Sequence, residues 1–249
     1  MRVAVIAGTP VDTKMGVDYI ERKNAETGSQ ICEPVYLPAA SDCDTQVRFQ
    51  YSDYFEKKRH IDSLFDSEIE KGTRDFFIYC NSLSGAFDFD AYASEKNAEL
   101  NMKANAKGTE EKTPVSDETV AKAPQIRIFT PLQVYRELGP KYKCLGVMAA
   151  NNLSAHAIEE ALMSTNPGIY VIGSGNMSVV HAIEDGKSPS GIIEEYGLAD
   201  MCSYMKASGA EALLLGCTHF PYFKSELSEH TDLPIINPAD EMYERMISN

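Results

Sequence analysis

Eight short apolar runs, separated by amphipathic stretches, are the feature that most constrains the fold of this chain. The runs cover residues 2–7, 33–38, 75–80, 126–129, 144–149, 169–173, 212–217 and 234–237. Each has the length of a strand, and most of the stretches between them have helical spacing. Strands that alternate with helices form parallel sheets with right-handed crossovers. The pattern therefore predicts an α/β fold, with the eight strands in one sheet or in two sheets of four.

Length and charge narrow the range of partners. The 249 residues are enough for one large domain or two small ones, and the net charge of −14 describes an acidic surface. Such a surface argues against nucleic acid and anionic membranes as main partners. No apolar run reaches the roughly 18 residues of a membrane helix, and the N-terminal stretch lacks the pattern of a signal peptide. We expect a cytoplasmic protein with a small-molecule partner.

The six cysteines are spaced in a way that does not predict a metal site. None of them forms a C-x-x-C pair, so we expect no structural zinc and no other metal. In a reducing cytosol they are expected to be free thiols, most of them buried as small apolar side chains.

Two cysteines end predicted strands in matching contexts, "DFFIYCNS" and "ALLLGCTH". Cys80 and Cys217 stand at the carboxyl ends of these strands, where α/β sheets bind ligands and where a following helix N-terminus lowers a thiol pKa. Asn81, Ser82 and Thr218 follow directly and supply hydrogen-bond donors. From this pattern alone, core packing of each cysteine and a paired functional role both stay open.

The two motifs also resemble those of a known family. "GCTHFP" (216–221) closely resembles the second-cysteine motif of the aspartate/glutamate racemases, and "CNS" (80–82) resembles their first-cysteine motif. The resemblance implies two similar Rossmann-like or flavodoxin-like domains, each with a mainly parallel sheet of about four strands, and an active site in the cleft between them. We expect the first domain over 1–125, completed by 226–249, and the second over 126–225. Family members usually form homodimers.

The resemblance implies a chemistry for the two thiols. Cys80 and Cys217 would act as the acid/base pair of an amino-acid racemase that needs no cofactor, one thiolate removing the α-proton while the other thiol returns one to the opposite face. The implied substrate is a small acidic amino acid, aspartate or glutamate. His219 would poise the second cysteine, although it could instead cap a helix or lie at the surface.

Three further regions are candidate substrate contacts. Gly8 and Thr9 lie in the loop after the first strand, which is closer to the glycine-rich loop of aspartate racemases than to the Asp-Ser pair of glutamate racemases. Arg48 lies where aspartate racemases carry an arginine that grips a carboxylate, and Asn152 lies in a turn resembling the family's Thr-rich turn. The simpler alternatives are a surface Arg48, a helix-capping Asn152 and a loop-capping Asp12.

Other functions remain open at this point. One is a cysteine-dependent isomerase of a non-amino dicarboxylate, similar to maleate isomerase, in which a cysteine attacks a double bond. Another is a non-catalytic small-molecule binding protein, and a third is a thiol redox protein, which would need the two cysteine Cα atoms within about 7 Å. The polar stretch 94–124 is expected to be a solvated, partly helical excursion, with a lid over the site as the alternative.

Overall fold

Two parallel four-stranded sheets form the centre of the protein. The structure is a computed structural model and describes residues 1–28, 30–110 and 123–248. The sheet orders are β2-β1-β3-β4 and β6-β5-β7-β8, and every strand pair is parallel. The strands are β1 (Arg2–Ala7), β2 (Glu33–Pro38), β3 (Asp75–Ile78), β4 (Arg127–Phe129), β5 (Cys144–Ala149), β6 (Tyr170–Gly175), β7 (Ala212–Gly216) and β8 (Ile235–Ile236). The predicted α/β class with two similar four-stranded sheets is confirmed.

Two strands join sheets other than those that the expected domain limits assign to them. β4 lies within the expected second domain (126–225), but it pairs with β3 in the first sheet. β8 lies within the expected C-terminal completion of the first domain (226–249), but it pairs with β7 in the second sheet. The reason is that each sheet is formed by four strands that are consecutive in the chain, and the fourth strand of each pairs with the third. The division into folding domains itself stays a prediction.

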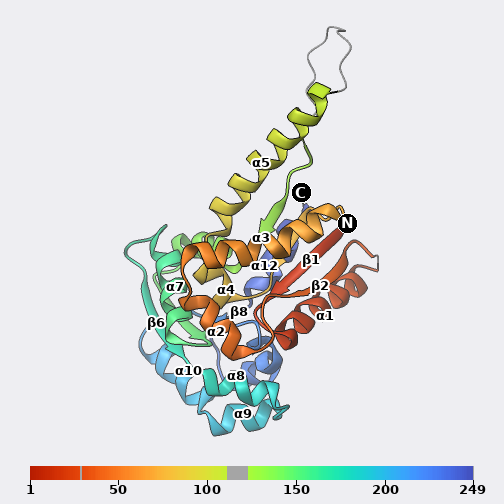
Figure 1. Ribbon diagram of the computed structural model, residues 1–249. Coiled ribbons are helices and arrows are strands. Elements are labelled where there is room, and N and C mark those ends of the chain that lie inside the picture. The colour runs from red at the N-terminus through yellow and green to blue at the C-terminus, as the bar shows by residue number, and fades with distance from the viewer. Residues whose placement is uncertain (29, 111–122, 249) are drawn as a thin grey trace.

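Helices connect consecutive strands and cover the sheets (Figure 1). In the first half they are α1 (Pro10–Thr27), α2 (Cys43–Tyr51), α3 (Tyr54–Glu70), α4 (Asn81–Ala86), α5 (Phe89–Glu110) and α6 (Pro131–Leu138). In the second half they are the 3₁₀ turn η1 (Gly139–Lys141), α7 (Asn152–Met163), α8 (Met177–Glu184), α9 (Pro189–Glu195), α10 (Leu198–Ala207), η2 (Phe220–Phe223), α11 (Lys224–Ser228) and α12 (Pro238–Ser248).

The end of α1 shows how the sequence fixes a helix boundary. Gly28 follows the last helical residue with φ of 68°, the left-handed conformation that glycine adopts without steric cost. At the other end Pro10 occupies the first turn, where its missing N–H leaves no hydrogen bond unmade. These caps set the helix at 10–27, directly after the loop that holds Gly8 and Thr9.

The polar stretch 94–124 is helical in its first part, up to residue 110, and residues 123–124 at its end have no regular secondary structure. Residues 94–110 belong to α5, which extends away from the two sheets (Figure 1). Residues 111–122 of the expected excursion lie outside the described residues. None of the described helices has both the length and the apolar character needed to span a bilayer.

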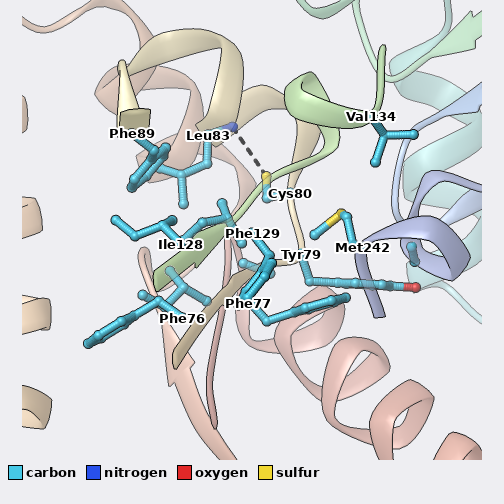
Figure 2. Close-up of a cluster of buried hydrophobic side chains, with 14 of the residues drawn as sticks. Phe76, Phe77, Tyr79, Cys80, Leu83, Phe89, Ile128, Phe129, Val134 and Met242 are labelled. Carbon is cyan, nitrogen blue, oxygen red and sulfur yellow. Dashed lines mark hydrogen bonds between the residues drawn. The ribbon is translucent and has the colours of Figure 1, made fainter. Parts of the chain in front are cut away.

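Aromatic packing supports the first sheet. The rings of Phe65 and Phe76 stack with centroids 4.1 Å apart, and both side chains are fully buried. Figure 2 shows the cluster continuing through Phe77 and Phe129 to Cys80, which lies at its edge beside Leu83. Cys80 is therefore supported by a densely packed hydrophobic cluster.

Candidate active site

Both cysteines line one small cavity at the carboxyl ends of β3 and β7. Its volume is about 40 Å³, and it is lined by residues that follow strands of both sheets. Seven of the residues singled out from the sequence line it: Thr9, Cys80, Asn81, Ser82, Cys217, Thr218 and His219. Cys80 and Cys217 are 137 positions apart in the chain (217 − 80), yet both line this one cavity.

Cys80 is held as a buried thiol at the start of α4. It is 5% exposed and occupies the N-cap position, where its Sγ accepts a hydrogen bond from the Leu83 N–H at 3.3 Å (Figure 2). Burial raises the pKa of the Cys80 thiol well above its ordinary value, and the nearby Asp12 carboxylate raises it further. The sequence-based expectation that the helix N-terminus would lower this pKa is wrong, because desolvation outweighs the backbone donors.

Cys217 stands beside an imidazole that is held by a carboxylate. The Cys217 Sγ lies 3.7 Å from His219 Nδ1, and His219 Nε2 lies 3.1 Å from Glu184 Oε1. Burial lowers the pKa of His219, but hydrogen bonds to Cys217 and Glu184 outweigh it and raise the pKa to about 10. His219 is therefore an imidazolium near neutral pH, and an adjacent cation stabilises a thiolate.

The Asn81 amide is oriented by a buried tyrosine. The Tyr135 hydroxyl donates to Asn81 Oδ1, and burial raises the pKa of Tyr135 so that it stays a donor. Since a hydroxyl donor fixes which end of the amide is oxygen, Asn81 Nδ2 is the free end. That nitrogen is buried without a protein partner and belongs to a residue that lines the cavity, so it is available to a ligand.

The loop after β1 is closed by a capping box. Thr9 caps α1, and Asp12 accepts hydrogen bonds from the Thr9 N–H at 2.6 Å and the Gly8 N–H at 3.2 Å. Burial raises the pKa of Asp12, against these donors and the neighbouring His219. The loop-capping alternative for Asp12 is thus present in the structure, and the same side chain also lines the cavity.

Helix α7 packs between the two cysteine segments through very close contacts. A Cβ added at Gly85, in α4, would lie 2.7 Å from Ala157 Cβ of α7. A Cβ added at Gly216, directly before Cys217, would lie 2.4 Å from Ile158 Cδ1 of the same helix. Real Cβ atoms are not found at such distances, so a larger residue at either position would require α7 or its side chains to shift.

Three residues singled out from the sequence do not line the cavity. Arg48 is exposed on α2, and Asn152 is exposed at the first position of α7, whose N-cap is Asn151. Gly8 contributes its N–H to Asp12 and lies against the Gln46 side chain. Their roles as substrate contacts stay predictions.

Sequence reasoning missed several polar groups of the site. Gln46 and Gln50 reach the cavity from α2, and Glu184 reaches His219 from the end of α8. One signal was readable in the sequence: Gln46 and Gln50 have helical i, i+4 spacing and therefore share a face. Among the described residues, no group of three or more His, Cys, Asp or Glu side chains is arranged to hold a metal ion.

Part of the amino-acid sequence is similar to that of known enzymes. No protein-family model matches the chain. It is 29% identical over 103 residues to a glutamate racemase of Limosilactobacillus reuteri, a match that covers 40% of this chain and 38% of the relative. It is 24% identical over 135 residues to a glutamate racemase of Limosilactobacillus fermentum, covering 49% of this chain and 50% of the relative. The chain thus matches half the length of these relatives or less.

Solved structures share the whole fold. A glutamate racemase from Francisella tularensis in complex with D-glutamate covers 99% of this chain with a TM-score of 0.65 at 19% identity, over 80% of its own length. An aspartate racemase from Picrophilus torridus gives 0.59 at 13% identity, covering 99% of this chain and 93% of its own. An allantoin racemase from Klebsiella pneumoniae gives 0.60 at 12% identity, covering 100% and 86%. The chain is thus similar in part of its sequence to glutamate racemases, and it shares its two-sheet fold with glutamate, aspartate and allantoin racemases.

Proposed function

We propose that this protein racemises a small amino acid related to aspartate and glutamate, with Cys80 and Cys217 as the two acid/base groups and without a cofactor. The observation that carries the proposal is that both thiols line one cavity although they follow strands of different sheets. Two bases on opposite faces of a carbon allow inversion, whereas a single base tends to return the proton to the face it came from.

The two cysteines act on opposite faces of the α-carbon. Cys217, whose Sγ lies 3.7 Å from His219 Nδ1, removes the α-proton in its thiolate form and thereby forms an S–H bond. The electron pair of the broken C–H bond passes into the carboxylate and gives an enolate-like dianion. Cys80, whose raised pKa keeps it a thiol, donates its proton to the other face. Starting from the opposite enantiomer, the roles are exchanged.

The dianion needs donors that are in place before the charge develops. Asn81 Nδ2 is such a donor, because the Tyr135 hydroxyl already occupies the other end of the amide. Thr218 and Ser82 line the same cavity and add hydroxyl groups. Loss of one preorganised donor of this kind typically costs about 10²–10³ in rate. Glu184 acts through His219, as a positioning residue.

The test is α-proton exchange in D₂O, followed by ¹H NMR. L- and D-aspartate, L- and D-glutamate and their side-chain amides are incubated with the wild-type protein and with Cys80→Ser and Cys217→Ser. We expect exchange with inversion in the wild type. Each serine variant should lose inversion by roughly 10³-fold or more, with any residual exchange confined to the enantiomer whose α-hydrogen faces the remaining thiol.

Two results would count against the proposal. If both serine variants inverted the substrate at the wild-type rate, neither cysteine would be an acid/base group of the reaction. No exchange with any amino acid, together with cis–trans conversion of maleate, would assign the site to the isomerase alternative, in which no α-proton leaves.

A further inference from the structure

One side chain in the cavity has its entire hydrogen-bonding capacity unused. Gln46, on α2, is 6% exposed, and both its Nε2 and its Oε1 are buried without a protein partner. Buried amide groups are almost always paired, and leaving one unpaired is costly. Because Gln46 lines the cavity, a ligand there is the natural partner. Such a ligand must present an acceptor to Nε2 and a donor to Oε1.

The amide is held at this place by the loop after β1. A Cβ added at Gly8 would lie 2.9 Å from both Cγ and Cδ of Gln46, so the side chain packs directly over the glycine backbone. The Gly8 N–H is in turn held by Asp12 at 3.2 Å. The glutamine is therefore seated against a fixed loop, as a recognition group requires.

The charges around the cavity disfavour an anionic ligand. An adjoining cleft of about 510 Å³, which shares Thr9 with the cavity, is lined by Asp42, Asp44, Glu184 and Asp185. Within the described parts of the chain, neither the cavity nor this cleft is lined by a lysine or arginine. An approaching dicarboxylate would meet several carboxylates and one imidazolium, whereas a zwitterion without net charge would not be repelled.

Building on the function proposed above, we propose that the preferred substrate carries a side-chain carboxamide or ureido group where aspartate and glutamate carry a carboxylate, and that Gln46 recognises it. A carboxamide or ureide offers an N–H and a C=O side by side. It can accept from Nε2 and donate to Oε1 in one cyclic pair, which satisfies both buried atoms. A carboxylate has only acceptors, so it would leave Oε1 facing a second oxygen.

Two kinds of compound share this chemistry, and exchange measurements distinguish them. Initial rates of α-proton exchange in D₂O are measured for L-asparagine and L-glutamine, for L-aspartate and L-glutamate, and for L-citrulline as an amino acid with a side-chain ureido group. We expect kcat/KM for the preferred amide or ureide to exceed that of the acids by about tenfold to a hundredfold. Whether an open-chain amide or the ureide is faster identifies the source.

Substitutions at Gln46 test the assignment to this side chain. Gln46→Lys supplies the missing cation and should lower the amide-to-acid ratio of kcat/KM by about tenfold or more. Gln46→Met keeps the length but makes no such hydrogen bonds, so it should bring the ratio towards one. Gln125→Lys is the matched control: the same substitution at an exposed glutamine that does not line the cavity should leave the ratio unchanged. Circular dichroism of each variant checks folding.

The outcomes separate this inference from the function on which it rests. Exchange of aspartate or glutamate that is faster than that of their amides, and still dependent on Cys80 and Cys217, would overturn the substrate class and leave the racemase intact. An amide preference unaffected by Gln46→Lys and Gln46→Met would overturn the role of Gln46. Exchange with none of the compounds would remove both proposals together.

Discussion

Replacing Glu184 by glutamine removes the charge that holds His219 as an imidazolium while leaving the shape of the side chain. Glu184 Oε1 lies 3.1 Å from His219 Nε2, and the glutamate side chain is 21% exposed. At that distance, with an effective dielectric constant of about 20, the Coulomb attraction is about 5 kcal/mol. Water at the exposed edge and the remaining amide hydrogen bond reduce the expected loss to about 1–3 kcal/mol.

The loss of this attraction should appear as a lower pKa of His219. Because 1.36 kcal/mol corresponds to one pKa unit, Glu184→Gln should lower the pKa of His219 from about 10 to roughly 8–9. The alkaline limb of the pH–rate profile should move to lower pH with it, since the positive charge beside Cys217 is lost when His219 deprotonates. NMR titration of a ¹³C-labelled histidine ring measures the pKa directly, and initial rates between pH 6 and 11 give the profile.

The free energy of unfolding should also depend on pH through the protonation of His219. The folded-state pKa of His219, about 10, is above the unfolded value of about 6.5. Its stabilising contribution is therefore complete below pH 6.5 and is lost as the pH rises towards 10. Urea unfolding across this window should show a decline that Glu184→Gln makes smaller.

A neighbouring substitution separates the hydrogen bond from a general field effect. Asp185→Asn removes the same charge one position further along, from an exposed side chain. It should leave the His219 titration close to that of the wild type. If Glu184→Gln left the His219 pKa unchanged, or if Asp185→Asn lowered it equally, the reasoning from the 3.1 Å contact would be refuted.

Two further substitutions probe the packing behind the site. Tyr135→Phe removes the donor to Asn81 Oδ1, so the amide is free to turn; kcat should fall about tenfold or more with a smaller change in KM, and an unchanged kcat would show that the amide orientation is irrelevant. Phe65→Ala removes a fully buried ring stacked on Phe76 and should lower the free energy of unfolding by about 3–5 kcal/mol in urea denaturation, whereas a loss below about 1 kcal/mol would mean that the core refills the space.

The strands and the main site residues were predictable because each depends on local sequence. A run such as 212–217 can be assigned to a buried strand from its composition, and a cysteine at its end falls at the edge where parallel strands present ligands. The matching contexts of Cys80 and Cys217 left both core packing and a shared site open, and the resemblance to the racemases then favoured a shared site. The alternation also predicted two sheets of four as one of two arrangements, and the structure has that arrangement.

Features that depend on distant contacts were not predictable in the same way. Glu184 ends a helix 35 positions from His219, and nothing in its neighbourhood indicates that contact. The raised pKa of Cys80 arises from the completed enclosure, which the helix N-terminus argument could not include. The membership of β4 in the first sheet is likewise decided by pairing, since its three residues, Arg127–Phe129, carry too little sequence to specify a partner.

The two glycine contacts of α7 have a consequence for how this site can change over evolution. Gly85 lies in the helix that follows Cys80, and Gly216 adjoins Cys217, so α7 packs closely against the segments of both cysteines. A methyl group added at Gly85 would collide with Ala157 and push α4 and α7 apart. The placement of the two cysteine segments thus depends partly on Gly85, Ala157 and Ile158, which do not line the cavity, so substitutions there can change its shape while every polar group in it is kept.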